Sequence, residues 1–119
     1  MTNPLKGEIQ LKIGSKDYKA RLTVDAIMQI ETACGCGILK LAQRMGDADI
    51  RVTDLINVLT PALRGGGKDF QPKDIATIIS DAGIIEATTA VANLLTAAIS
   101  PTDDSGEDSK GGNSQKKGS

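Results

Sequence analysis

Two cysteines separated by one glycine, Cys34-Gly35-Cys36, form the most reactive side-chain pair in this sequence. Two thiolates could supply half of a tetrahedral zinc site that a second subunit completes. The pair lacks the usual two-residue spacer, however, and a disulfide across a single residue would be strained. The chain also has no histidine, the commonest general base and metal ligand. We therefore expect a helix end with a small buried Cys34, and no catalytic, cofactor-binding or metal-binding residue.

A second candidate is the glycine-rich run Gly65-Gly66-Gly67-Lys68, which invites comparison with a phosphate-binding P-loop. A P-loop needs glycine at the position of Ala62 and serine or threonine at the position of Asp69, and neither is present. The run also follows a predicted helix rather than a strand. We therefore predict that Gly65, Gly66 and Gly67 form a flexible hinge between two helices.

The N-terminal part of the chain predicts an antiparallel β-hairpin. Apolar and polar residues alternate from Glu8 to Ile13 and again from Tyr18 to Leu22, with turn-forming residues from Gly14 to Asp17 between them. One face of this hairpin is apolar. An isolated hairpin is marginally stable in water, so we expect helices to cover that face.

The rest of the chain shows the 3.6-residue spacing of helices. Thr23 and Thr53 are placed to cap helices, Pro72 suits a first helical position, and Pro61 is expected to kink or shorten its helix. The sequence thus predicts an α+β fold in which the N-terminal hairpin packs on a bundle of about four or five short helices. The expected segments begin near residues 23, 38, 53, 72 and 84.

Composition indicates one domain followed by a tail. Among 119 residues, 39% are hydrophobic but only 2% are aromatic, so the core must be built from aliphatic side chains. We assign residues 1–100 to a single domain and residues 101–119 to a disordered polar tail, because no hydrophobic residue follows Pro101. The net charge of −1 comes without a basic stripe, which argues against nucleic acid as a partner.

The same sequence gives an expectation for the compartment. No apolar run approaches the roughly 20 residues of a membrane helix, and the N-terminus is too short and polar for a signal peptide. Two cysteines without an export signal are typical of reduced thiols. We therefore expect a cytoplasmic protein without a membrane partner, in an oligomeric state that the sequence does not indicate.

The last predicted helix carries a broad apolar stripe. Val91, Leu94, Leu95 and Ala98 share one face, and many alanines make the surrounding surface smooth. This face has two interpretations. It is either entirely core, or it leaves part of the stripe exposed as a surface that binds a partner helix.

The order of several segments resembles a known family. Asn3-Pro4-Leu5-Lys6-Gly7-Glu8 precedes the hairpin, Leu22-Thr23-Val24-Asp25-Ala26 follows it, and Leu63-Arg64-Gly65-Gly66-Gly67 lies in mid-chain. From about Asn3 to Ser100, this arrangement is similar to the gene-transfer-agent type of phage tail assembly chaperone. The tail after Pro101 and the Cys34-Gly35-Cys36 pair have no counterpart in that likeness.

The resemblance implies a small, non-enzymatic protein of a phage or prophage tail module, acting in the bacterial host. Such chaperones bind the long helical tape-measure protein and keep it soluble until tail tube proteins polymerise around it. The tape-measure protein, and secondly the tail tube protein, are therefore the expected partners. The alternative is a small regulatory or host-protein-binding module of a prophage, which would share the helical core and the polar tail.

Overall fold

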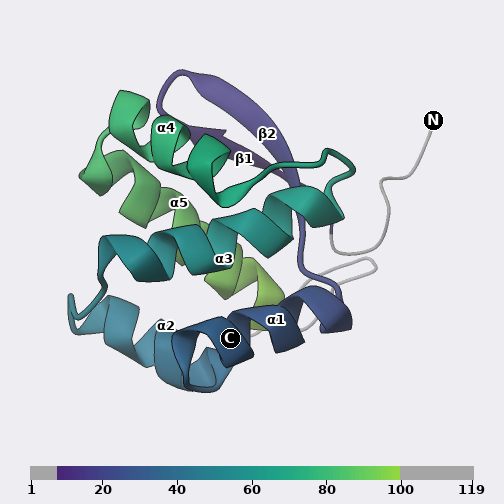
Figure 1. Ribbon diagram of the computed structural model, residues 1–119. Coiled ribbons are helices and arrows are strands. Elements are labelled where there is room, and N and C mark those ends of the chain that lie inside the picture. Colours follow the sequence, from purple (N-terminus) through teal and green to yellow (C-terminus); the bar gives the residue numbers. More distant parts are fainter. Residues whose placement is uncertain (1–7, 100–119) are drawn as a thin grey trace, which may run out of the picture.

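The computed structural model describes residues 8–99, which fold into a two-stranded antiparallel hairpin and five helices (Figure 1). The α+β prediction is confirmed. The predicted disordered tail, residues 101–119, lies outside the described residues. In chain order the elements are β1 (Glu8–Ile13), β2 (Lys16–Arg21), α1 (Val24–Cys34), α2 (Ile38–Gly46), α3 (Val52–Gly65), α4 (Pro72–Ala82) and α5 (Ile84–Ile99).

The hairpin turns tightly between Ile13 and Lys16, which face each other across the strands. Gly14 adopts a φ of +67°, a backbone conformation that glycine reaches without the steric cost of a side chain. On the inner face of β1, Leu11 and Ile13 are buried, as the alternating pattern predicts. The outer face is polar.

The first two helices begin and end where local chemistry dictates. Thr23 caps α1, since its side-chain oxygen accepts a hydrogen bond from the Ala26 backbone N–H at 3.0 Å. Gly35 ends α1 in the left-handed conformation, with a φ of 73°. The Glu31 carboxylate then accepts the Ile38 N–H at 2.9 Å, which ties the end of α1 to the start of α2.

The start of α3 differs from the prediction. Arg51, not Thr53, is the N-cap residue, and the Asp54 carboxylate accepts the Arg51 backbone N–H at 3.0 Å. This carboxylate provides the capping that the Thr53 hydroxyl was expected to supply. Pro61 also does not shorten the helix, which continues to Gly65. Pro61 lacks an N–H, and beside it the Thr60 hydroxyl donates to the Ile56 carbonyl at 2.8 Å.

Pro72 opens α4 as predicted, and Gly83 separates α4 from α5 with a φ of 94°. The Asp74 carboxylate accepts the Gln71 N–H at 2.8 Å and so caps the first turn. Within residues 8–99, no single helix has the length and apolar composition to cross a membrane. Helices α4 and α5 meet that test only when they are combined, and the chain bends by 118° between them.

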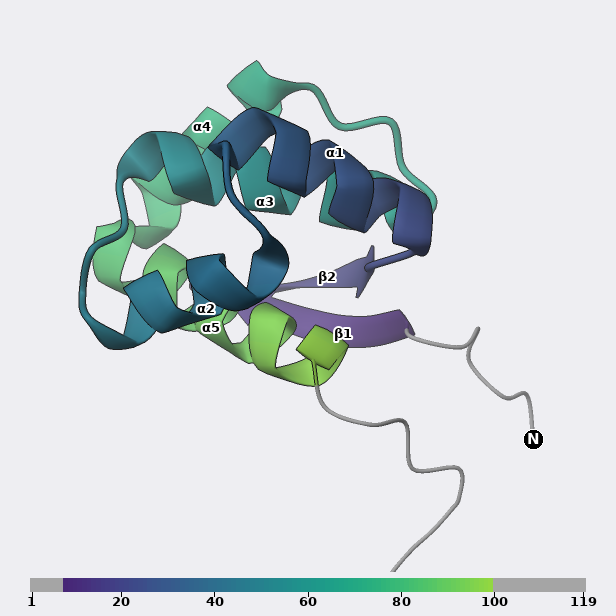
Figure 2. The same cartoon turned by 90° about the horizontal axis from the view of Figure 1, so that it is seen from below.

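Helices α3 and α5 lie at the centre of the molecule. The former packs against β2, α1 and α4, and the latter packs against β1, α2 and α4 (Figures 1 and 2). The two helices also contact each other beneath the inner face of the hairpin. Their buried side chains are almost all aliphatic, as the low aromatic content predicts, and the largest are Leu55, Leu59, Leu63, Leu94 and Leu95.

Candidate functional site

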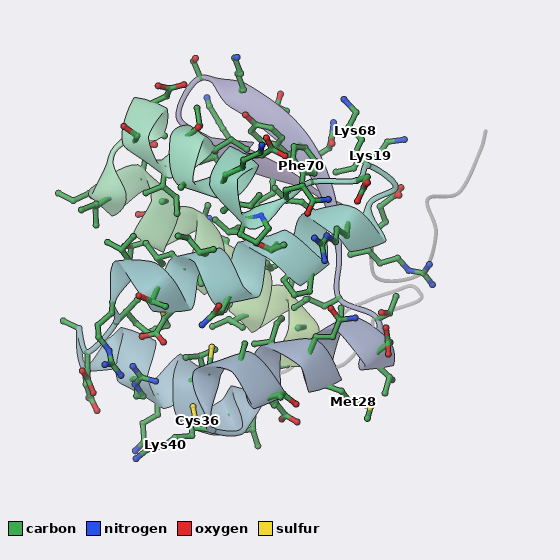
Figure 3. The ribbon with its side chains drawn as sticks, in the orientation of Figure 1. Lys19, Met28, Cys36, Lys40, Lys68 and Phe70 are labelled. Carbon is green, nitrogen blue, oxygen red and sulfur yellow. The ribbon has the colours of Figure 1, made fainter. Side chains whose placement is uncertain are left out.

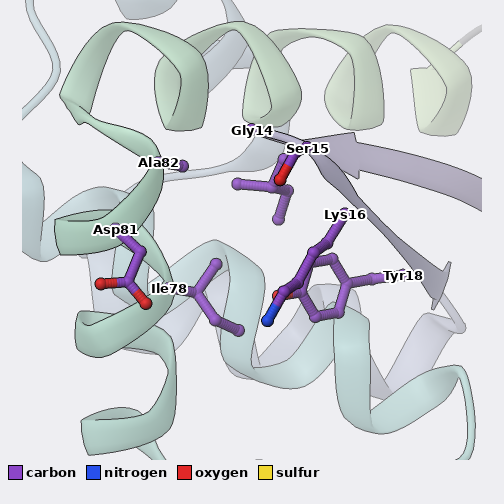
Figure 4. Close-up of a pocket in the computed structure, with 8 residues that line it drawn as sticks. Gly14, Ser15, Lys16, Tyr18, Ile78, Asp81 and Ala82 are labelled. Atoms are coloured by element: carbon purple, nitrogen blue, oxygen red, sulfur yellow. The ribbon is translucent and has the colours of Figure 1, made fainter.

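An open groove runs between the hairpin and α4. It consists of two adjoining hollows that share Tyr18 and Ile78. The hollow near the hairpin turn has a volume of about 150 Å³ and also touches Lys16 and Asp81 (Figure 4). The wider hollow has a volume of about 550 Å³ and extends to Phe70. We call these two hollows together the hairpin–α4 groove.

The floor of this groove contains both aromatic residues of the chain. The rings of Tyr18 and Phe70 meet edge to face, with centroids 6.1 Å apart. Tyr18 belongs to the inner face of β2, whereas Phe70 lies in the loop between α3 and α4. Arg64 holds this loop in place, because its Nε donates to the Phe70 carbonyl at 2.6 Å and its Nη2 to the Gln71 side chain at 3.3 Å.

Charged side chains line both rims of the groove, and the loop-side rim carries both signs because Asp69 lies next to Lys68 there. Lys16 and Lys68 lie on the hairpin and loop side, and Figure 3 shows Lys68 beside Phe70. Asp74 and Asp81 project from α4. An apolar floor between charged rims can accept an apolar side chain while the rims orient the polar residues that flank it. The arrangement therefore suits binding of a protein segment.

Cys34 and Cys36 are both free thiols and both half-buried. Burial raises the pKa of the Cys34 thiol, and the negative charge of Asp54 raises it further, while Arg44 acts in the opposite direction. At neutral pH this environment favours the unreactive thiol form. Within residues 8–99, no cluster of three or more acidic, cysteine or histidine side chains is placed to hold a metal ion.

Arg44 forms an ionic cluster beside these thiols, which the sequence analysis did not predict. Its Nη2 lies 2.7 Å from the buried Asp54 carboxylate, and its Nη1 lies 3.8 Å from the Cys36 sulfur. Its Nε also donates to the Asp49 carbonyl at 3.1 Å. The cluster joins the end of α2 to the start of α3, so its contacts are structural. No local sequence motif signals it, because its members lie on two helices and the two loops that flank α2.

The predicted hinge glycines have a packing role that the sequence did not reveal. A Cβ atom on Gly65 would clash with the carbonyl oxygen of Arg21, and one on Gly66 would clash with that of Lys19. Both carbonyls belong to the backbone of β2, so the end of α3 approaches this strand more closely than any side chain allows. Gly67 has no such neighbour and adopts a φ of +114°. Close packing thus explains why glycine occupies positions 65 and 66, and no movement of the chain is needed for that explanation. The hinge itself stays a prediction.

The apolar stripe of α5 lies mainly in the core. Val91, Leu94 and Leu95 are at most 2% exposed, and Ala98 is half-buried. The stripe therefore is not an accessible partner surface in this structure, since it covers the hairpin and α3 instead. The sequence pattern could not separate the two interpretations, because a buried stripe and an exposed one have the same spacing. Large exposed apolar side chains lie elsewhere, including Met28 on α1 (Figure 3) and Ile85 at the start of α5.

Comparison with known protein families gives one match. A family model described as phage tail tube protein, GTA-gp10, matches residues 6–100, which include every described helix and strand. Comparisons with curated proteins and with solved structures gave no significant match. The family match lies within the span of the likeness seen in the sequence, about Asn3 to Ser100, but its description names the tail tube rather than an assembly chaperone.

Proposed function

Because the chain belongs to the family described as phage tail tube protein, GTA-gp10, we propose that it serves tail assembly as a non-catalytic chaperone. In this proposal the chain binds a segment of the tape-measure protein in the host cytoplasm and holds it until tail tube proteins polymerise. The family match supports a role in a phage or gene-transfer-agent tail. The observation that carries the binding role is the hairpin–α4 groove, with its apolar floor and charged rims.

The groove favours an amphipathic helix as the bound segment. An apolar side chain of that helix would lie over Tyr18, Phe70 and Ile78. Acidic residues beside it would approach Lys68, and basic residues would approach Asp69 on the same rim or Asp74 on the opposite rim. The resemblance to tail assembly chaperones supplies the identity of the partner, since those proteins bind a long helical tape-measure protein.

A substitution on α4 tests this proposal without disturbing the core. Thr77 is exposed, lines the groove and makes only an intrahelical side-chain hydrogen bond, to the Lys73 carbonyl. Thr77→Arg should fill the groove. We expect it to reduce co-purification with the tape-measure protein of the same gene cluster by at least about tenfold, which corresponds to about 1.4 kcal/mol. Ala76→Arg is the matched control, because Ala76 is exposed on the same helix but does not line the groove.

Both variants should keep the helix content of the parent chain by circular dichroism. If Thr77→Arg and Ala76→Arg retain equal amounts of tape-measure protein, the groove is not the binding site. If the parent chain itself fails to bind or solubilise the tape-measure protein, the chaperone proposal is wrong.

The description of the family favours a second candidate function, a subunit of the tail tube itself. The two candidates differ in what becomes of the chain after assembly. A chaperone would be present in assembling cells but missing from finished tails, whereas a tube subunit would be a major component of them. Mass spectrometry of purified tails or gene-transfer-agent particles therefore distinguishes the two.

A further inference from the structure

The two edges of the hairpin have different surroundings. Because Ile13 and Lys16 close a two-residue turn, alternate residues on each strand exchange hydrogen bonds across the hairpin. The peptide groups of Glu8, Gln10 and Lys12 therefore point away from β2. In the same way, the peptide groups of Lys19 and Arg21 point away from β1.

The outer edge of β2 is covered by the chain itself. The carbonyls of Lys19 and Arg21 lie against Gly66 and Gly65, at the end of α3. Figure 2 shows β2 on the side of α3 and α1, with β1 on the far side of the hairpin. The unpaired strand edge that commonly causes aggregation is thus blocked on this side.

Helices α4 and α5 pack against β1, but neither forms a backbone hydrogen bond to its outer edge. No backbone hydrogen bond within residues 8–99 joins Glu8, Gln10 or Lys12 to a loop or to another element. The side chains of Gln10 and Lys12 are exposed. The strand therefore presents a row of peptide groups that another extended strand can bind.

The side-chain order of β1 is complementary to itself in the antiparallel direction. If two copies meet on a twofold axis at Gln10, each Glu8 lies opposite Lys12 of the partner subunit, and the two Gln10 residues face each other. All the outward-pointing peptide groups then form directly hydrogen-bonded pairs. On the inner face, Ile9 lies opposite Leu11 of the partner subunit, so apolar residues also meet.

The neighbouring strand extends this pattern. Within one hairpin, Lys12 lies opposite Asp17 and Glu8 lies opposite Arg21. Pairing of two copies would therefore produce rows of four side chains in which charge alternates across the sheet: Asp17, Lys12, Glu8 of the partner subunit and Arg21 of the partner subunit. Opposite charges on directly facing positions stabilise a sheet, and like charges destabilise it.

We propose that two copies of this chain pair edge to edge through β1, forming a four-stranded antiparallel sheet in the order β2–β1–β1–β2. The bound partner of this edge is a second copy because the Glu8-to-Lys12 pattern complements itself. This association is separate from the hairpin–α4 groove, which lies on the α4 side of the hairpin, and it does not depend on the proposed chaperone role.

A proline at the centre of the edge tests the pairing. The Gln10 N–H points away from β2, so Gln10→Pro should preserve the hairpin while it removes a central hydrogen bond and blocks the partner strand. In light scattering coupled to size exclusion, the full chain should shift from its monomer mass of 12.4 kDa toward twice that value as concentration rises. Gln10→Pro should stay at the monomer mass with an unchanged circular dichroism spectrum.

A charge exchange tests the register independently of any effect of proline on folding. Glu8→Lys and Lys12→Glu should each weaken self-association, since each places like charges opposite one another. An equimolar mixture of the two variants should recover dimers, because every facing pair between unlike copies is then complementary. Lys19→Glu, on the outer face of β2, is the control and should leave the mass unchanged.

Three results would overturn the proposal. The first is a parent chain that remains monomeric at every concentration. The second is a folded Gln10→Pro variant that dimerises like the parent chain. The third is a mixture of the two charge variants that forms no dimer although the parent chain does.

Discussion

The outer edge of β2 and the outer edge of β1 belong to one small sheet, yet they have different surroundings. The end of α3 covers the first, and glycines at positions 65 and 66 allow the backbones to touch. The second meets no hydrogen-bonding element in the part of the chain that the structure describes. The comparison shows how one hairpin can be closed on one side by its own chain and left available on the other. It also gives Gly65 and Gly66 a role, because they allow α3 to cover the outer edge of β2.

The largest expected effect comes from uncovering the β2 edge. Gly66→Ala places a Cβ atom where the Lys19 carbonyl lies, so either the end of α3 or the strand must move. The end of α3 and the Lys19 carbonyl are both parts of the backbone, so neither can rotate away as a flexible side chain would. We expect a loss of unfolding free energy of about 3 kcal/mol or more, measured by urea denaturation. Gly65→Ala should behave similarly because of the Arg21 carbonyl.

Gly46→Ala is the matched control for this effect. Gly46 is the last residue of α2, and a Cβ atom there would meet open space. Alanine favours helices more than glycine does, so this variant should be neutral or more stable by up to about 1 kcal/mol. If Gly66→Ala and Gly46→Ala have the same stability, the close approach of α3 to β2 is not a real constraint, and the glycine run returns to the hinge interpretation.

An intermediate effect is expected at the hairpin turn, where both strands meet α4. Gly14 has a φ of +67°, and a Cβ atom there would lie 3.0 Å from the Ala82 Cβ. Gly14→Ala should therefore cost about 1–2 kcal/mol of unfolding free energy, from backbone strain together with the crowded contact. The neighbouring Ser15 is exposed, so Ser15→Ala should change stability by less than about 0.5 kcal/mol. Equal thermal melting of the two variants would contradict this prediction.

The sequence predicted those features that depend on nearby residues. Alternation placed the hairpin, helical spacing placed five helices, and Thr23 and Pro72 marked helix starts correctly. These signals are local, since each needs only the few residues around it. The start of α3 was misplaced because an aspartate in the first turn supplied the cap that a threonine was expected to supply.

The sequence did not predict features that depend on how distant segments meet. Gly65 is explained by the carbonyl of Arg21, which lies far from it in the chain. The groove likewise brings Tyr18 to Phe70, and no pattern within either segment indicates that contact. The stripe of α5 was recognised, but its burial depends on the elements that cover it. The family resemblance supplied the tail-related role, which neither composition nor spacing could have given.

The smallest expected effect concerns amide hydrogen exchange along β1, and it tests the comparison without any substitution. The Leu11 N–H points toward β2 within the hairpin and should be protected at every protein concentration. The Gln10 and Lys12 N–H groups point outward, and no backbone group among residues 8–99 of the same copy accepts a hydrogen bond from them. If copies pair through β1, these two amides should exchange about twofold more slowly when half of the chains are paired, because only the unpaired fraction exchanges. Nuclear magnetic resonance at two concentrations measures all three amides together.

In Gln10→Pro, the Lys12 amide should lose this dependence on concentration. A Gln10 amide protected as strongly as that of Leu11 in dilute solution would show that the chain covers β1 as well, and the difference between the two edges would disappear.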